Sequence, residues 1–294
     1  MIAGFKKSTV NCNGVDLSVH RAGQGVPLLL LHGFPQNHMC WERVAPQLAR
    51  HHDVIIPDLR GYGESEAPPN ESGNSTYSKR TMAQDIADLL TVLAIRSANV
   101  LGHDRGARVA YRFALDHPKR LHKLGIIEIV PTADFWASWT ADLALAAYHW
   151  TFLAQPAPLP ERMIGADPVA YVDWTLAQWT QSKSLDIFSP AALDSYRKQA
   201  QNPERVHAMC SDYRAGASFD RTLDEEDKIA GKQIAVPLRL LYGAHGFPAK
   251  SGNAVEVWRS WAQRVDASVC DAGHFVMEEN PQAVLSAFES FFAP

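Results

Sequence analysis

The residues Gly102-His103-Asp104-Arg105-Gly106 carry the clearest chemical signal in this sequence. Their Gly-x-nucleophile-x-Gly spacing is typical of a nucleophile elbow, a sharp strand-to-helix turn that exposes one side chain above a sheet. The flanking glycines leave room for the turn, and an aspartate stands where such elbows commonly carry serine. A carboxylate attacks saturated carbon directly and forms an alkyl ester of the enzyme. Asp104 therefore predicts displacement at carbon, as in dehalogenation or epoxide opening.

His274 is the best-placed general base among the twelve histidines. It follows the last predicted strand, where a loop can carry it back to the elbow. The loop His32-Gly33-Phe34-Pro35 follows the third predicted strand. We expect the backbone amides of Phe34 and Arg105 to stabilise a developing oxyanion. A tight turn with a cis Pro35 is compatible with that role.

The histidine also needs a carboxylate that fixes its tautomer and balances its charge. The penultimate strand, which runs into Leu241–Gly246, offers no such group. Glu128 lies in the apolar run Ile126–Thr132, where burying a carboxylate is costly unless it is paired. We therefore predict Glu128 as the third member of the triad and keep Asp134 as the alternative. The competing interpretation of Glu128 is a strand-end residue that faces solvent.

Composition excludes several classes of protein. The 294 residues are 46% hydrophobic and 20% charged, as in a globular chain, and the net charge of −4 gives no reason to expect nucleic-acid or membrane binding. The start lacks the apolar region of a signal peptide, and the four cysteines are scattered. We therefore expect a cytoplasmic protein with reduced thiols. Neither HExxH nor CxxC occurs, so we predict no metal site.

Short apolar runs alternate with helical periodicity along most of the chain. This repeat is typical of a doubly wound, mostly parallel α/β sheet, whose ligands bind at the carboxyl ends of the strands. The predicted strands are Thr9–Asn13, Asp16–His20, Pro27–His32, Val54–Asp58, Asn99–Gly102, Leu121–Val130, Pro237–Gly243 and Ala267–Asp271, and the clearest predicted helices are Met82–Leu93 and Pro281–Phe292.

The strand signal disappears between residues 136 and 218. This segment holds five of the eight tryptophans, with helical spacing and proline breaks near Pro156–Pro160. We predict a helical cap over residues 136–218, inserted into a core formed by 1–135 and 219–294. Tryptophans in such a cap are usually core packing, but a cap above the elbow can also line a pocket.

Over its full length the chain resembles the α/β-hydrolase fold, and within it the haloacetate (fluoroacetate) dehalogenases. The matching stretches are His32–Asn37, Asp58–Gly63, Gly102–Gly106, His149-Trp150, Ser211–Arg214 and Gly273–Phe275. The resemblance implies that Asp104 is the nucleophile, His274 the base, and Arg105 with Arg108 the clamp for a substrate carboxylate. It also implies a halide site made by His149, Trp150 and Tyr213. The family usually has aspartate at the position of Glu128, so an extra methylene must be accommodated here.

The expected reaction is hydrolysis of a haloacetate, fluoroacetate included, to glycolate and halide through an ester on Asp104. No cofactor is needed, the expected partner is a small 2-halo acid, and the resemblance implies a homodimer. An epoxide hydrolase would use the same nucleophile and base but needs paired cap phenols, for which Tyr148, Tyr171, Tyr196 and Tyr213 are available. A non-catalytic ligand-binding protein on the same fold is the third hypothesis.

Overall fold

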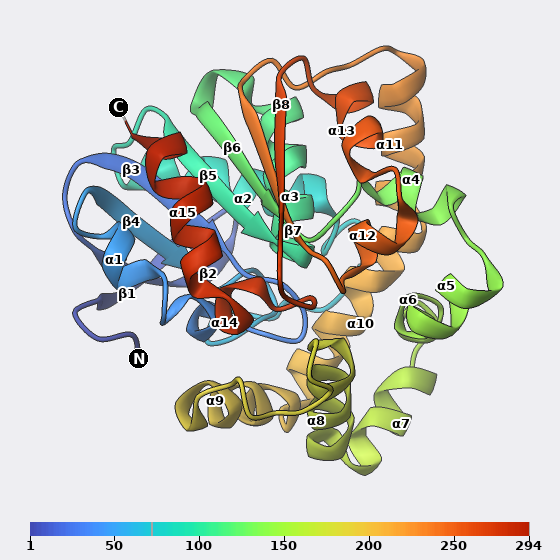
Figure 1. Cartoon of the computed structure of the whole chain (residues 1–294). Helices are drawn as coiled ribbons and strands as arrows, with labels where there is room; N and C mark the ends of the chain where they lie inside the picture. The colour runs from blue at the N-terminus through green and yellow to red at the C-terminus, as the bar shows by residue number, and fades with distance from the viewer. Residues whose placement is uncertain (72, 294) are drawn as a thin grey trace.

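The computed structural model describes residues 1–71 and 73–293 (Figure 1). Eight strands form one sheet in the order β1-β2-β4-β3-β5-β6-β7-β8. Only the pairs β1–β2 and β2–β4 run antiparallel, and every other neighbouring pair is parallel. The strands are β1 Lys6–Cys12, β2 Val15–Ala22, β3 Val26–Leu31, β4 His52–Pro57, β5 Ala98–His103, β6 Leu121–Ile127, β7 Leu238–Gly243 and β8 Val265–Cys270.

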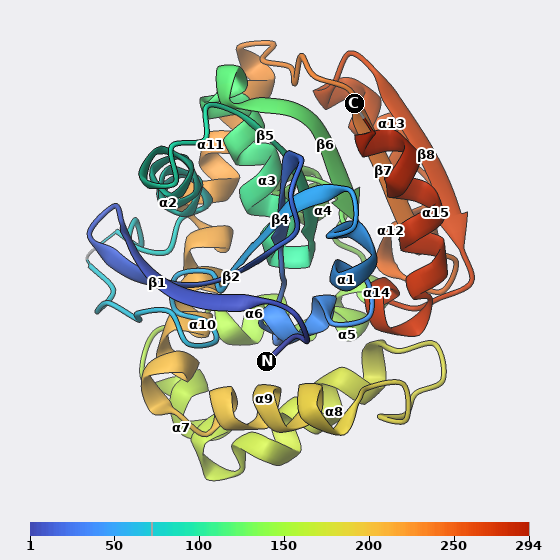
Figure 2. The same cartoon turned by 90° about the vertical axis from the view of Figure 1, so that its left-hand side faces the viewer.

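The middle of this sheet is buried on both faces. All side chains of β4 and β5, and Leu28–Leu31 of β3, are shielded from solvent, which explains why these strands read as continuous apolar runs. Helices α1 and α15 lie over one face, and α2 and α3 lie over the other (Figure 2). The predicted α/β-hydrolase fold class is confirmed.

The core helices connect successive strands and close the chain. In the views of Figures 1 and 2, α15 runs beside the sheet towards the C-terminus. These elements are η1 His38–Trp41, α1 Ala45–Leu48, α2 Lys79–Val92, α3 Asp104–Asp116, η2 Pro118–Arg120, α12 Phe247–Ser251, α13 Ala254–Trp261, α14 Val276–Glu279 and α15 Pro281–Phe292, where η marks a 3₁₀ helix.

Between β6 and β7, in a stretch that the structure describes completely, helices follow one another without a strand. Figure 1 shows α6 to α9 of this insertion below the sheet. The predicted cap limits fall inside α4 and at the junction of α10 with α11. The helices are α4 Thr132–Ala137, α5 Ala141–Ala146, α6 Tyr148–Leu153, α7 Leu159–Ala166, α8 Pro168–Trp179, α9 Pro190–Ala200, α10 Pro203–Ala217 and α11 Phe219–Ile229.

The backbone conformation at two positions bears on the site. The strand expected over Leu121–Val130 ends earlier, at Ile127, because Glu128 adopts a positive φ of 65° that turns the chain out of the sheet. The Phe34–Pro35 peptide bond is cis, as expected for that tight turn. Across residues 1–71 and 73–293, no helix is both long and apolar enough to traverse a lipid bilayer.

Candidate active site

The carboxyl ends of the parallel strands bring together the segments that carry the predicted triad. Asp104 directly follows β5, Glu128 directly follows β6, and His274 lies in the loop after β8. The Phe34 loop follows β3, the neighbour of β5. Because parallel strands end at the same edge of a sheet, residues far apart in the sequence meet there.

The elbow has the strained geometry that its glycine spacing predicts. Asp104 is the first residue of α3 and has a positive φ of 47°, a conformation that non-glycine residues seldom adopt. A Cβ on Gly106 would lie 2.3 Å from the backbone oxygen of His32, so only glycine fits there. The turn places the carboxylate at a helix N-terminus, where the helix dipole favours negative charge.

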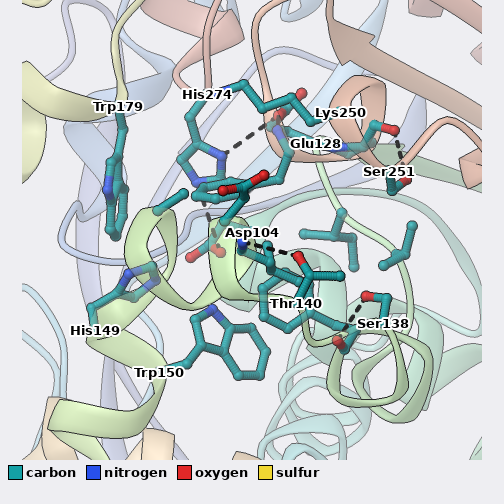
Figure 3. A pocket seen from close by; sticks show the side chains of 18 of the residues that line it. Asp104, Glu128, Ser138, Thr140, His149, Trp150, Trp179, Lys250, Ser251 and His274 are labelled. Carbon is teal, nitrogen blue, oxygen red and sulfur yellow. Dashed lines mark hydrogen bonds and ion pairs between the residues drawn. The ribbon is translucent and has the colours of Figure 1, made fainter.

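Asp104 is buried among groups that stabilise its anion. Its Oδ1 accepts a hydrogen bond of 2.9 Å from the amide of Phe34, and its Oδ2 lies 3.8 Å from Nε2 of His274 (Figure 3). Burial alone would raise the pKa of Asp104, but electrostatic interactions with His274 and with the first two arginines of α3 outweigh burial and hold it below the ordinary value. The carboxylate is therefore ionised and ready to attack.

His274 lies between two carboxylates. Its Nδ1 is 3.9 Å from Oε1 of Glu128, on the side opposite Asp104 (Figure 3). Glu128 also accepts hydrogen bonds from the amides of Gly243 at 2.7 Å and Phe247 at 2.9 Å. Burial raises the pKa of Glu128, opposed by His274 and these two amides. The arrangement matches an acid–base–nucleophile triad, with contacts of 3.8 Å and 3.9 Å that are longer than hydrogen bonds.

The extra methylene of Glu128 is accommodated by a glycine. A Cβ on Gly246 would lie 1.6 Å from Oε1 of Glu128, so the longer acid occupies space that a side chain at 246 would fill. The alternative acid, Asp134, does not approach His274. Its carboxylate accepts hydrogen bonds from Lys228 at 2.6 Å and from the Trp261 indole at 2.7 Å. Of the two candidates, only Glu128 lies beside the histidine.

Arg105 is buried and held by an acid that sequence reasoning did not single out. Its Nε donates to Asp212 Oδ2 at 3.1 Å, and its Nη2 donates to the Asp212 carbonyl at 2.8 Å and to Oδ1. Nη1 of Arg105 is buried and has no hydrogen-bond partner among the described residues. The protein thus fixes Nε and Nη2 of the guanidinium and leaves Nη1 without a partner in the described chain.

Asp212 also binds two further side chains. Lys79, from α2, donates to its Oδ1, and the Tyr62 hydroxyl donates to its Oδ2 at 2.8 Å. Burial lowers the pKa of Lys79 to about 8, with the like charge of Arg105 adding to that effect and Asp212 opposing it. For Asp212, burial is outweighed by Arg105 and Lys79, so its pKa lies well below the ordinary value. This carboxylate positions Arg105.

Arg108 reaches the site from the next turn of α3. Its Nη1 donates to the carbonyl of Val130 at 3.0 Å and to Oγ1 of Thr132 at 3.1 Å. Its Nε is buried without a partner in the described part of the chain. Arg108 and Asp104 line the same cavity, so a cation lies close to where a substrate must sit.

The three residues predicted as a halide site come together. The ring centroid of Tyr213 lies 5.6 Å from that of His149 and 5.7 Å from that of Trp150. Figure 3 shows the Trp150 indole nitrogen turned toward Asp104, with His149 beside it. His149 Nδ1 and the Tyr213 hydroxyl are buried, and neither has a partner among residues 1–71 and 73–293. Burial lowers the pKa of His149 to about 3, so this imidazole is neutral.

A catalytic cavity of about 320 Å³ joins these groups. Asp104, Arg108, Glu128, His149, Trp150 and His274 line it, together with apolar residues such as Val130, Phe135 and Leu143 and polar residues such as Ser138, Thr140 and Lys250. Phe34, Arg105 and Tyr213 are not part of this lining. Instead, the Arg105 Cζ lies 4.4 Å from the Tyr213 ring centroid and 5.4 Å from that of Trp150, so these groups form the layer next to it.

Gln199 of α9 ties the insertion to the loop that presents the Phe34 amide. Its Nε2 donates to the carbonyls of Pro35 at 2.9 Å and Gln36 at 3.3 Å, and its Oε1 accepts from the amide of Gly63. Nothing in the local pattern of α9 singled this residue out, because its partners lie more than 130 positions away.

One cluster in the described chain has the composition of a metal site, and it lies away from the triad. Ligand atoms of His20, His38 and Asp58 are within 4.8 Å of one another. The His38 ring and backbone amide already hydrogen-bond to Asp58, and the imidazoles of His20 and His38 stack with centroids 3.8 Å apart. None of these three residues is among those that line the cavity of Asp104.

Comparison with known proteins places the chain in its family. The family described as alpha/beta hydrolase fold matches residues 26–281. A fluoroacetate dehalogenase from Burkholderia sp. is 37% identical over 293 residues, covering 100% of this chain and 95% of the relative. A soluble epoxide hydrolase from Corynebacterium sp. (strain C12) is 32% identical, covering 96% and 95%. The crystal structure of an α/β hydrolase from Nostoc sp. PCC 7120, a protein assigned only provisionally, superposes with a TM-score of 0.96 at 40% identity over 99% of both chains.

The resemblance predicted from Asp104, the arginines and the His149-Trp150 pair is thereby confirmed. The chain is a hydrolase, and it belongs to the haloacetate dehalogenase-like members of the α/β-hydrolase fold family.

Proposed function

We propose that this protein hydrolyses haloacetates, fluoroacetate included, to glycolate and halide. The observation that carries the proposal is that Asp104 and Arg108 line one buried cavity. An anionic nucleophile repels an anionic substrate unless a cation offsets the charge, and a desolvated arginine does so with directed N–H donors. Arg108, and Nη1 of Arg105, supply such donors next to a carboxylate that is kept ionised.

In the first step, Asp104 attacks the halogen-bearing carbon in line. A C–O bond forms, the carbon–halogen bond breaks, and halide departs with the bonding electrons toward His149, Trp150 and Tyr213. In the second step, His274 takes a proton from water, and the resulting hydroxide attacks the ester carbonyl of Asp104. The Phe34 and Arg105 amides hold the oxyanion, and Glu128 balances the imidazolium. When the tetrahedral intermediate collapses, the ester C–O bond breaks and His274 returns its proton to the leaving alkoxide, which departs as glycolate. Asp104 then releases to solvent the proton that the hydroxide carried and is a carboxylate again.

The epoxide hydrolase hypothesis needs two phenols that protonate the opening ring. No tyrosine is among the described residues that line the catalytic cavity. The Tyr196 hydroxyl donates to Glu278 at 3.1 Å, and Tyr148 and Tyr171 line a separate surface cavity. Tyr213 alone of the four lies beside the triad. These contacts favour haloacetate hydrolysis.

The test is to incubate the protein separately with fluoroacetate, chloroacetate, bromoacetate and styrene oxide. Halide is measured by ion chromatography and diol by gas chromatography. We expect halide and glycolate in equal amounts and no diol. Diol without halide would establish the epoxide hydrolase instead, and neither product would favour the ligand-binding protein.

A further inference from the structure

A second cavity, of about 310 Å³, adjoins the catalytic cavity at His274. The two share five lining residues: Ala146, Trp179, Phe247, Lys250 and His274. Asp104 and Arg108 line only the catalytic cavity. The second cavity therefore touches the general base but not the nucleophile.

The ionisable side chains that line the second cavity are all basic. They are Lys183, His245, Lys250 and His274, and no carboxylate belongs to the described lining. The lining of the catalytic cavity, by contrast, includes the carboxylates of Asp104, Glu128 and Asp142. The whole chain has a net charge of −4, so the basic lining of this cavity has the opposite sign to the charge of the protein as a whole.

The two lysines lack carboxylate partners. Lysine ion pairs in the described chain involve Lys7, Lys79, Lys198, Lys228 and Lys232, and neither Lys183 nor Lys250. Burial lowers the pKa of Lys183, and the like charge of Lys250 adds to that shift. Two neighbouring cations without an acid between them favour an anion from solution.

The carboxylates next to this lining are already engaged. Asp271 accepts a hydrogen bond of 2.9 Å from the Gln181 side chain and lies 3.4 Å from Nε2 of His245. Glu279 accepts backbone hydrogen bonds from Gln181 at 2.7 Å and from Gly273 at 2.9 Å. Glu279 attracts Lys183 over a distance but does not pair with it.

We propose that the second cavity binds small monoanions, halide or a short carboxylate, beside Lys183 and Lys250. The site gathers the anionic substrate next to the catalytic cavity and holds an anionic product on its way out. This role in turnover rests on the function proposed above, whereas the binding of an anion does not.

Two tryptophans of the second cavity can report anion binding by their fluorescence. Trp174 and Trp179 line it, and Trp174 is 50% exposed, whereas Trp41, Trp258 and Trp261 are completely buried. Iodide quenches tryptophan fluorescence on contact and carries the charge of the proposed ligand. Acrylamide quenches without charge and reports exposure alone. The ratio of the two quenching constants therefore measures how strongly the cavity concentrates an anion.

The test compares Lys183→Gln/Lys250→Gln with Lys6→Gln/Lys119→Gln, a control pair that removes the same charge from exposed lysines outside both cavities. The measurement is made at about 10 mM ionic strength, where charges act over roughly 30 Å. We expect Lys183→Gln/Lys250→Gln to lower the quenching constant for iodide roughly threefold or more. The acrylamide constant should stay the same. Trp174→Phe should remove most of the iodide-sensitive signal in the otherwise unchanged protein.

Turnover supplies the second readout. In the Lys183→Gln/Lys250→Gln protein, kcat/KM for chloroacetate should fall by a similar factor with little change in kcat, and the difference should vanish near 0.5 M salt. An iodide constant equal to that of the control pair overturns the anion site, whatever the turnover. A lowered iodide constant in a protein that releases no halide keeps the anion site and removes the proposed function.

Discussion

Asp104, Glu128 and His274 stand at the carboxyl ends of sheet strands, whereas His149, Trp150 and Tyr213 come from helices of the insertion. The sheet residues are held by backbone: the Phe34 amide binds Asp104, and two amides bind Glu128. The helix-borne rings pack on one another, and His149 Nδ1 and the Tyr213 hydroxyl have no hydrogen-bond partner among the described residues. The two carboxylates of the core half, the sheet residues, are thus held by backbone amides, whereas the cap half, the helix residues, keeps polar atoms that no described residue binds. We expect the core half to determine whether the covalent reaction occurs and the cap half to determine which leaving group is accepted.

The largest effect should come from the core half. Asp104→Asn should abolish turnover, by roughly 10⁴-fold or more, because an amide does not attack saturated carbon. His274→Asn should instead stop after ester formation. Intact-mass analysis after addition of chloroacetate should then show a glycolyl adduct of about 58 Da, as expected for a covalent intermediate.

The double variant Asp104→Asn/His274→Asn is the control and should carry no adduct. An unmodified mass in His274→Asn, together with slow steady turnover, would contradict the two-step scheme. It would also contradict the expectation that the core half determines the covalent reaction.

Trp150→Phe tests the cap half. It keeps an aromatic ring next to Tyr213 and removes the indole N–H. Fluoride is a poor leaving group that gains most from hydrogen bonds as it departs, so fluoroacetate turnover should fall roughly 10²-fold or more, the usual effect of one such donor. Chloroacetate turnover should fall much less. Equal losses on both substrates would assign Trp150 to packing alone.

Arg108→Lys tests whether the core half also recognises the substrate. Lysine keeps the charge but loses the planar set of donors, of which Nη1 is now held by Val130 and Thr132. We expect kcat/KM for haloacetates to fall by about tenfold, and the melting temperature to report any structural cost separately. An unchanged kcat/KM would limit Arg108 to a structural role.

The smallest effect is expected at the contact between the halves. Gln199→Leu removes the bonds to the Pro35 and Gln36 carbonyls and loosens the loop of the Phe34 amide. That amide is needed most for the oxyanion of the second step, so ester hydrolysis should slow by a few-fold, roughly the effect of a displaced rather than deleted donor. Intact mass during turnover should show more ester than in the wild type. Gln201→Leu, at the exposed end of the same helix, should leave the ester fraction unchanged.

The predictions for the core half rest on local sequence signals, whereas those for the cap half rest on the family resemblance. Strand ends and elbows obey local rules: glycine spacing located Asp104, and the cost of a buried acid located Glu128. The helix predicted over Pro281–Phe292 coincides with α15, because its proline start and apolar periodicity lie in one stretch. These signals can be read within about a dozen residues.

Contacts between segments that are distant in the sequence give no such local signal. Asp212 lies in a stretch that the family resemblance had marked, but its bond to Arg105 spans 107 positions, and its bond to Lys79 spans 133. The resemblance implied that Arg105 clamps a substrate carboxylate, and the structure shows that its Nε and Nη2 are bound by Asp212. The sequence did not predict a role for Gln199 for the same reason. The periodicity of a helix reveals its buried face but not the loop on which that face rests.

Asp212 has a consequence for how freely the inserted helices can be exchanged among relatives. Arg105 and Lys79 belong to the core, and the acid that neutralises both belongs to α10 of the insertion. Consider a chimera that keeps this core but takes an insertion without an acid at position 212. It would leave Arg105 and Lys79 buried without a counter-charge, and each would cost several kcal/mol of stability. Chimeras and designed variants must therefore exchange α10 together with residues 79 and 105, although the helix and the two residues lie on opposite sides of the junction between core and insertion.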